Sequence, residues 1–223
     1  MAFQLEFLNS ACYFRRLETA CLEDIIKYIF EKRVLGGEVV LWEGDKEENL
    51  YFVITGLLKL FATSADGREF VVRLAYGGDS ANDEAMFDKG PNVLSAMAMS
   101  PVLLYGLHRD NLEKIRRAHP PVDEAIAQVF AARQRYLVRL TTELVFKNVT
   151  GRLARLLLER EKLLDGENRD LRITQQEMAA MIGTVREIVS RSLHEMETRG
   201  AVIVDHNQIV IKDKKLLLEL SSL

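Results

Sequence analysis

Cysteines and long apolar runs are scarce in this sequence, and their scarcity excludes several classes of protein. Cys12 and Cys21 are the two cysteines among 223 residues, too few for a disulfide framework or for the roughly four thiolates of an iron–sulfur cluster. We expect both to be packing residues, with a redox role left open. The longest apolar runs fall far short of the roughly 18 residues that cross a bilayer. Residues 1–10 lack the basic and apolar segments of a secretory signal, so we expect a cytoplasmic protein without membrane contact.

An excess of charge of one sign is also missing. The net charge is −3, and residues 148–223 carry 12 Lys and Arg against 12 Asp and Glu. Any binding to DNA must therefore come from a few well-placed cations and helix N-termini rather than from a broadly basic surface. Glycine and proline number only 13 and 4, while 48% of the residues are hydrophobic, which excludes collagen-like, low-complexity and disordered chains.

Motifs of common enzyme classes are missing as well. The sequence has no nucleophile elbow, no Walker loop, no Cys or His cluster with zinc spacing and no HExxH helix. Asp83 and Glu84 are adjacent, which is not the spacing of an acid–base pair across a substrate. We therefore expect a protein that is not an enzyme.

Residues 30–107 have the pattern of a β-structure. Glycines at 44, 56, 67 and 77 separate runs rich in Val, Leu, Phe and Tyr, which is typical of short antiparallel strands in a sandwich, roll or jelly-roll. Alternation in EFVVRLAY predicts a strand with Arg73 nearer solvent. The core-facing residues of this strand would be Phe70, Val72, Leu74 and Tyr76. We also expect residues 94–100 and 102–107 to pair as strands, and a short amphipathic helix over 18–31.

The β-pattern is interrupted between Gly77 and Pro101. A loop and one helical turn, from about Ala81 to Phe87, are inserted there. A short helix inserted into a roll is often a ligand site because its unpaired N–H groups point inward. A purely structural connector is the alternative.

Residues 121–147 are predicted to form one long helix. Its apolar seam has the 4, 3, 4, 3, 4 spacing of a coiled coil and consists of Ile126, Phe130, Arg133, Leu137, Leu140 and Leu144. This spacing favours a parallel homodimer, and the alternative is a helix that packs on its own domain. Arg133 in such a seam is costly without a partner, so it sets the register or contacts something bound beside the helix.

The last third of the sequence indicates a winged helix-turn-helix. Thr174 and Glu177 have the spacing of a capping box, Gly183 suits the turn, and a second helix is expected from about Thr184. Side chains of the types that bind base edges lie on the outer face of this second helix. They are Val185, Arg186, Glu187, Ser190 and Arg191. The segment AVIVDHNQIVIKD predicts two short strands, which would form the wing.

Over nearly its full length the chain resembles the CRP/FNR superfamily of transcription regulators. ITQQEMAAMIGTVREIVSRSLHEMETRGAV follows the family's helix-turn-helix signature, and NVTGRLARLLLE is similar to the segment after its dimer helix. The resemblance implies an α+β fold. Its parts are a cyclic-nucleotide-binding-like β-roll (jelly-roll) over residues 1–108, a linker and long dimerisation helix over 109–147, and a winged helix-turn-helix over 148–223. It also implies a homodimer that binds a palindromic promoter site in double-stranded DNA and contacts RNA polymerase.

The resemblance further assigns DNA contacts to individual residues. Arg186, Glu187 and Arg191 match base-contacting positions, with Arg186 typical of the CRP-like branch and Ser190 of the FNR-like branch, so the half-site should contain TGA. The positions that match phosphate contacts are Thr174, Gln175 and Gln176. Gln175 stands where the cyclic-AMP-responsive type has a cation.

The sensor half departs from the cyclic-nucleotide pattern. Asn92 stands where an arginine would clamp the phosphate, and Asp83 and Glu84 add negative charge at the inserted helix. Leu137 and Val138 replace hydroxyl-bearing residues that would contact adenine. We therefore expect an effector other than cyclic AMP.

An apolar small molecule, or an aromatic acid whose carboxylate meets Arg133, is the first choice of effector. The expected pocket is lined by Asp83, Glu84, Asn92, Val93, Arg133, Tyr136 and Leu137. A heme-based gas sensor with unnamed ligands and a regulator without an effector remain the alternatives, and no metal site is predicted. A cyclic-nucleotide-binding module without DNA binding is a further alternative.

Overall fold

The structure is a computed structural model that divides into two compact units. The described residues are 2–15, 17–163, 173–205 and 208–222. The first unit comprises residues 1–62 with 72–135, and the second comprises residues 63–71 with 136–223. Each unit has a hydrophobic core of its own.

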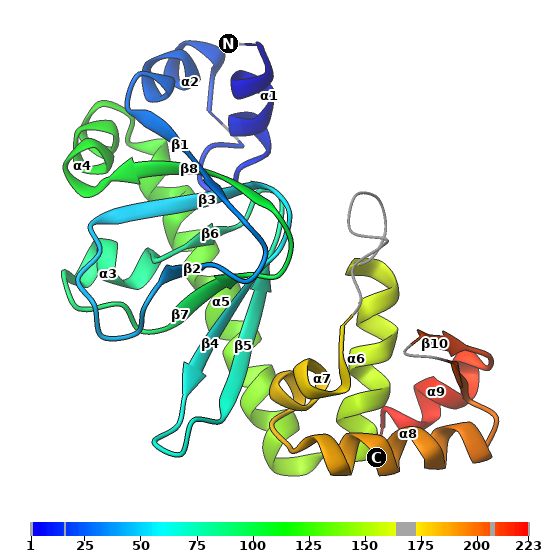
Figure 1. Cartoon of the computed structure of the whole chain (residues 1–223). Helices are drawn as coiled ribbons and strands as arrows, with labels where there is room; N and C mark the ends of the chain where they lie inside the picture. Colours follow the sequence, from blue (N-terminus) through cyan, green and yellow to red (C-terminus); the bar gives the residue numbers. More distant parts are fainter. Residues whose placement is uncertain (1, 16, 164–172, 206–207, 223) are drawn as a thin grey trace. The chain divides into compact units, whose positions relative to one another are not determined.

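Within the described residues, two four-stranded antiparallel sheets build the roll (Figure 1). One sheet has the order β1 (Ile29–Val34), β8 (Val102–His108), β3 (Asn49–Thr55) and β6 (Ser80–Ala81). The other has the order β2 (Val39–Leu41), β7 (Ser95–Ala98), β4 (Leu58–Thr63) and β5 (Glu69–Ala75). The jelly-roll class predicted from the glycine spacing is confirmed.

Apart from β4 and β5, consecutive strands of the roll lie in different sheets, which makes one sequence prediction wrong. β7 and β8 do not pair with each other, because β7 lies between β2 and β4 while β8 lies between β1 and β3. The crossings between sheets are tight. A Cβ added at Gly56, where φ is +84°, would lie 2.3 Å from the Pro101 carbonyl oxygen. Glycine is therefore required at this crossing.

The predicted facing of β5 is also wrong. Val71 and Ala75 are buried, whereas Tyr76 is 45% exposed. Arg73 lies on the same side as Val71 and Ala75, and its side chain is only 15% exposed. Alternation alone assigns an arginine to solvent, but here the arginine has a buried anionic partner.

Helices cover one end of the roll. They are α1 (Ala2–Ser10), α2 (Thr19–Ile26) and α4 (Arg109–Ala118) (Figure 1). The helix expected over residues 18–31 is shorter than predicted, because α2 ends at Ile26 and β1 begins at Ile29. Phe14, Phe52 and Tyr105 belong to the core beneath these helices.

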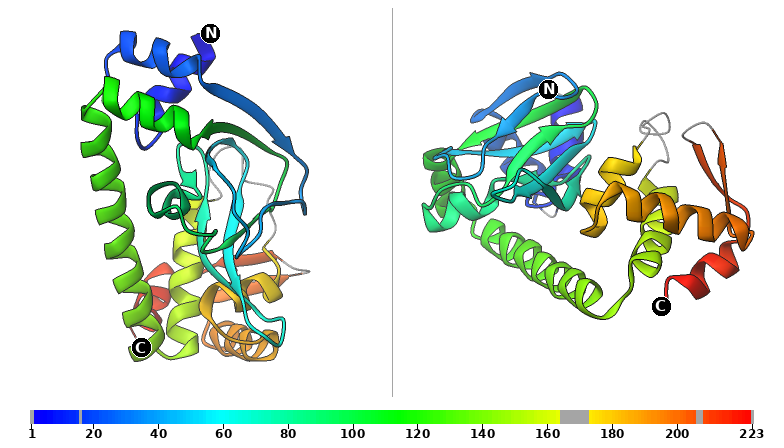
Figure 2. Two further views of the ribbon diagram at one scale, coloured as in Figure 1. Left: turned by 90° about the vertical axis from the view of Figure 1, so that its left-hand side faces the viewer. Right: turned by 60° about the horizontal axis from the view of Figure 1, so that its bottom comes forward.

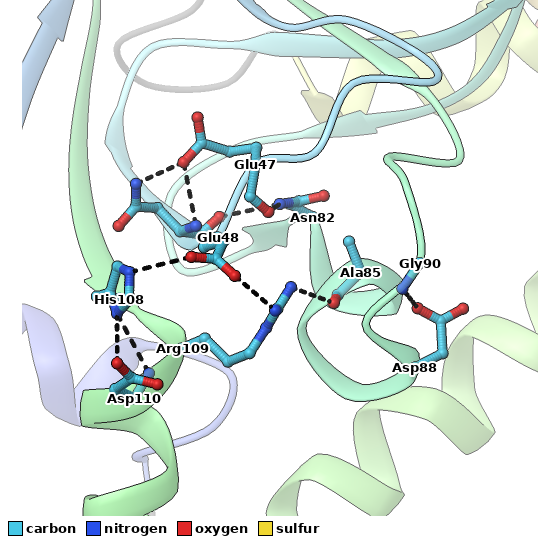
Figure 3. Close-up of polar contacts among 10 residues, drawn as sticks. Glu47, Glu48, Asn82, Ala85, Asp88, Gly90, His108, Arg109 and Asp110 are labelled. Carbon is cyan, nitrogen blue, oxygen red and sulfur yellow. Dashed lines mark hydrogen bonds and ion pairs between the residues drawn. The ribbon is translucent and has the colours of Figure 1, made fainter.

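The inserted helix is present as α3 (Asp83–Asp88), and it is anchored at both ends of its first turn (Figure 3). Asn82 precedes it with a φ of +71° and donates through Nδ2 to the carbonyl oxygens of Glu47 and Asn49, both at 3.0 Å. Arg109 donates through Nη2 to the Ala85 carbonyl oxygen at 3.0 Å. These contacts fix α3 against β3 and the start of α4.

The long helix α5 spans Pro121–Phe146, as predicted, and is continuous (Figure 2). The residues in the first half of its predicted dimer seam make contacts within the single chain. Ile126 is 7% exposed in the core of the roll, and the Phe130 ring packs edge-on against Phe87 with centroids 5.4 Å apart. Arg133 pairs with Asp83 of α3. A seam of Ile126 to Leu144 is therefore wrong for the first half of α5, where this face packs on its own domain.

The second unit holds helices and a two-stranded hairpin (Figure 1). Its helices are α6 (Val149–Leu163), α7 (Gln175–Ile182), α8 (Arg186–Thr198) and α9 (Lys214–Leu220). β9 (Val202–Asp205) pairs antiparallel with β10 (Gln208–Ile211), which confirms the two strands of the wing. The turn between them, residues 206–207, lies outside the described residues.

Candidate functional site

The first helix of the helix-turn-helix begins where the sequence predicted. Thr174 Oγ1 accepts from the Glu177 N–H at 3.2 Å, and the Thr174 N–H donates to Glu177 Oε2 at 2.6 Å. This reciprocal capping box satisfies two of the helix's unpaired donors. Gln175 and Gln176 form the first turn of α7, with Gln175 half-buried and Gln176 exposed. Thr174 itself is exposed.

A glycine ends α7 and sets the turn. Gly183 has a φ of +66°, which L side chains rarely adopt. A Cβ there would lie 3.0 Å from Leu144 Cδ2, a flexible side-chain end, so it is the backbone conformation that requires glycine. α8 then begins at Arg186, two residues later than the expected Thr184, with Val185 as its N-cap residue.

One face of α8 is buried and the other is open. Val189, Leu193 and Met196 are at most 2% exposed and join the core of the second unit. The opposite, N-terminal face carries exposed side chains, namely Arg186, Glu187, Ser190 and Arg191. Arginine, glutamate and serine at the N-terminal end of such a helix are suited to base edges in a major groove. The predicted recognition residues therefore share one exposed face.

Two residues that sequence reasoning missed hold α8 and its turn in place. Arg152 of α6 donates through Nε to the Ile182 carbonyl oxygen at 2.9 Å and through Nη1 to the Lys147 carbonyl oxygen at 2.7 Å. Thr150 donates to Ser192 of α8 at 3.2 Å. Polar residues in the first turn of the helix, just before the apolar run LARLLL, are the signal that could have indicated them.

A second group of polar side chains is buried inside the roll around Asp83. We call it the Asp83 cluster. Its members are Tyr13, Arg73, Ser80, Asp83 and Arg133. Asp83 is completely buried; its Oδ1 accepts from the Tyr13 hydroxyl and from Ser80 Oγ, the latter at 2.6 Å. Arg133 Nη1 forms an ion pair with Asp83 Oδ2, and Arg73 Nη2 lies 3.8 Å from the same oxygen.

Two guanidinium groups converge on one residue of the cluster. Arg133 Nη2 donates to the carbonyl oxygen and to Oγ of Ser80, at 3.1 and 2.7 Å. Arg73 Nη2 donates to the same carbonyl oxygen at 2.5 Å. Asp83 is thus the carboxylate in direct contact with both of these buried cations. Its charge is neutralised internally, so it does not by itself repel a phosphate.

The protonation of the neighbouring groups follows from their burial. Burial, followed by the nearby Asp83 carboxylate, raises the pKa of the Tyr13 hydroxyl well above its ordinary value, so this hydroxyl keeps its proton and donates it in a hydrogen bond. Burial also raises the pKa of the Cys12 thiol to about 11. A protonated thiol is a poor nucleophile, which supports the interpretation of Cys12 as a packing residue.

The structure brings only some of the residues predicted to line the effector pocket into contact with one another. Asp83 and Arg133 are in contact. Asn92 is 3% exposed and donates through Nδ2 to the Trp42 carbonyl oxygen at 2.8 Å, so it holds the turn beside β2. The described contacts connect it to neither Asp83 nor Arg133.

The remaining predicted pocket residues differ in exposure. Val93 and Leu137 are 55% and 43% exposed, while Glu84 and Tyr136 are half-buried. Within the described residues there is no group of three or more His, Cys, Asp or Glu that could hold a metal ion. A helix long and apolar enough to cross a membrane is likewise not found in that part of the chain.

Sequence reasoning missed Tyr13, Ser80 and Arg73 as members of a polar site. Arg73 was assigned to solvent, and Tyr13 stands in an aromatic, core-like segment. An arginine within the apolar run FVVRLA is the one local sign that a buried anion would be needed.

Comparisons with known proteins agree with both units. A family model described as a Crp-like helix-turn-helix domain matches residues 151–220, and one described as a cyclic nucleotide-binding domain matches residues 31–119. A CRP-like cAMP-activated global transcriptional regulator of Mycobacterium tuberculosis is 28% identical over 217 residues, which is 95% of this chain and 97% of that protein. A cyclic AMP receptor protein of Thermus thermophilus is 29% identical over 199 residues, 89% of this chain and 91% of that protein.

Solved structures show the same fold. A CRP/FNR-family transcriptional regulator of Thermus thermophilus matches with a TM-score of 0.73 at 26% identity, covering 86% of this chain and 98% of that one. The c-di-GMP-responsive global regulator CLP of Xanthomonas campestris matches with a TM-score of 0.77 at 21% identity, covering 88% and 100%.

A cyclic-nucleotide-binding-like roll followed by a long helix and a helix-turn-helix defines a class of DNA-binding transcription regulators. The chain belongs to the CRP/FNR superfamily of transcription regulators.

Proposed function

We propose that this regulator binds double-stranded DNA as a homodimer at a palindrome with TGA-containing half-sites. The observation that carries the proposal is the exposed N-terminal face of α8. Arg186 and Arg191 would pair with guanines, and Glu187 would accept from a cytosine amino group. Thr174, Gln175 and Gln176 would contact phosphates at the start of α7.

A selection from randomised duplex DNA tests this proposal. Wild-type protein is expected to enrich an inverted repeat whose half-site centres lie about one helical turn, or 34 Å, apart. The half-sites should contain TGA. Enrichment of a direct repeat, or of no sequence, would contradict the proposal.

The dimer would form through a face of α5 that is open in the single chain. Exposed residues recur along α5 with the 4, 3, 4, 3, 4 spacing of a coiled-coil seam. They are Ala127, Ala131, Gln134, Val138, Thr141 and Val145. This stripe is shifted by one residue from the seam predicted by sequence, because the other face packs on its own domain. Val138 and Val145 are 56% and 67% exposed, a cost that pairing with a second copy would remove.

The effector is proposed to be other than a cyclic nucleotide, although both relatives compared above are described as cyclic AMP regulators. The argument rests on contacts within this chain. Asn92 carries no positive charge, and its side-chain amide donates to the Trp42 carbonyl oxygen. The Arg133 guanidinium is engaged by Asp83 and Ser80. A carboxylate effector would have to displace Asp83, so an apolar small molecule is favoured over an aromatic acid.

Calorimetric titration with cyclic AMP and cyclic GMP tests this part. No binding is expected at micromolar ligand, because no free guanidinium is assigned to the phosphate. The control is the cyclic AMP receptor protein of Thermus thermophilus in the same buffer. Saturable micromolar binding to this chain would contradict the proposal.

A heme-based gas sensor is the alternative. His108 lies 3.6 Å from Glu48 and 3.8 Å from Asp110 (Figure 3), and His119 lies 3.4 Å from Asp24. The imidazoles of His108 and His119 therefore already have carboxylate neighbours. A Soret band in protein purified from heme-supplemented cells would favour this alternative.

The proposed regulator acts in the cytoplasm and contacts RNA polymerase at the promoter.

A further inference from the structure

The segment after α1 is built into the roll. Tyr13 and Phe14 are completely buried. The Cys12 N–H donates to the Gly78 carbonyl oxygen at 2.9 Å, and Cys12 Sγ lies 3.3 Å from Ser80 Oγ. The N-terminal segment is therefore held against the residues that lead into the Asp83 cluster.

The ring and the hydroxyl of Tyr13 have separate contacts. The ring packs edge-on against Phe52, with centroids 5.6 Å apart, while the hydroxyl donates to Asp83 Oδ1. Apolar packing would hold the ring without the hydroxyl. Removal of the hydroxyl alone therefore isolates its hydrogen bond to Asp83.

The Tyr13 hydroxyl and Ser80 Oγ both occupy Oδ1 of Asp83. Oδ2 of the same carboxylate is left for Arg133. Because Arg133 belongs to α5 and Asp83 to α3, this carboxylate links the long helix to the inserted helix. The orientation of Asp83, which Tyr13 helps to set, therefore determines where Arg133 is held.

We propose that Tyr13 is a positioning residue that acts through Asp83 on Arg133. Its phenol hydroxyl donates to Asp83 and keeps this carboxylate in the orientation that pairs with Arg133, which holds α5 against α3. This goes beyond the proposed function and depends on it only where DNA affinity is the readout.

Hydrogen exchange in the full chain tests the proposal. Tyr13→Phe is expected to speed amide exchange in α5 around Arg133 by about 10- to 100-fold, the equilibrium effect of losing one hydrogen bond to a charged group. Tyr51→Phe is the matched control, because Tyr51 is also buried in the roll, at 2% exposure, but is not in the Asp83 cluster. Unchanged exchange in Tyr13→Phe, or equal acceleration in both variants, would overturn the proposal.

Chemical rescue separates the hydroxyl from the ring. Tyr13→Ala removes both and leaves room for a small aromatic molecule. Added p-cresol supplies the ring and the hydroxyl, whereas toluene supplies the ring alone. Slow exchange around Arg133 should return with p-cresol and not with toluene. Equal rescue by the two compounds would mean that only packing matters, and the positioning role would be wrong.

DNA affinity gives an independent readout. Tyr13→Phe is expected to lower the affinity for the selected palindrome by about tenfold, because a loosened α5 raises the fraction of conformers that do not bind DNA. Tyr51→Phe should leave this affinity unchanged. If wild-type protein selects no DNA, the proposed function fails, while the exchange result still decides the role of Tyr13. An affinity identical to wild type in Tyr13→Phe would contradict the link from Tyr13 to DNA binding.

Discussion

Replacing Ala131 and Val138 together with glutamate is expected to convert a homodimer into monomers. Both side chains are exposed on the α5 stripe, where a second copy would bring four carboxylates into one apolar seam. A monomer engages one half-site instead of two, and losing the second contact costs about 100- to 10,000-fold in affinity for a palindrome. Multi-angle light scattering and fluorescence anisotropy measure the two effects.

The control variant also places two glutamates on α5, but at positions outside the stripe. Ala132→Glu with Arg139→Glu alters exposed residues on the adjacent face of α5 and should leave a dimer. If the stripe variant stays dimeric, the dimer forms elsewhere. If both variants become monomeric, general charge repulsion rather than the stripe is responsible.

Replacing Asp83 with alanine is expected to lower the free energy of unfolding by about 3–5 kcal/mol, because removal of one partner leaves the other charges buried and unpaired. Arg133 and Arg73 are 16% and 15% exposed and would both lose their counter-charge. Urea unfolding followed by circular dichroism, at one protein concentration because a dimer is proposed, measures the change.

An exposed ion pair between β4 and β5 provides the control. Asp66 lies 2.8 Å from Arg68, with side chains 60% and 71% exposed, and such pairs contribute little to stability. Asp66→Ala should therefore leave the unfolding midpoint near that of wild type. Equal destabilisation in Asp66→Ala and Asp83→Ala would show that the buried cluster has no special role.

Features fixed by neighbouring residues could be predicted from the sequence. The capping box of Thr174 and Glu177 needs only a three-residue spacing, and Gly183 needs only its own positive φ. The exposed face of α8 follows from the 3.6-residue period of its apolar residues. The glycine rhythm likewise predicted the roll, because turns are local.

Features that depend on distant partners could not be predicted. Arg73 is buried because Asp83, ten residues later and on another element, supplies its counter-charge. Tyr13 joins the same carboxylate from the N-terminal segment. Asn92 resembled a ligand-binding position, yet its amide is used to hold a turn. In each case tertiary contacts override the local pattern.

The central claim is that the exposed face of α8 binds the bases of a palindrome. The most direct measurement is the selection from randomised duplex DNA, run with wild-type protein, Arg186→Ala and Gln175→Ala at one salt concentration. Arg186→Ala should lose preference at one base pair in each half-site, since a bidentate arginine contributes about 1–3 kcal/mol of discrimination. Gln175→Ala should keep the consensus and bind every sequence more weakly, because its proposed partner is a phosphate. A consensus unchanged by Arg186→Ala would contradict the assignment of α8 as the recognition helix in this register.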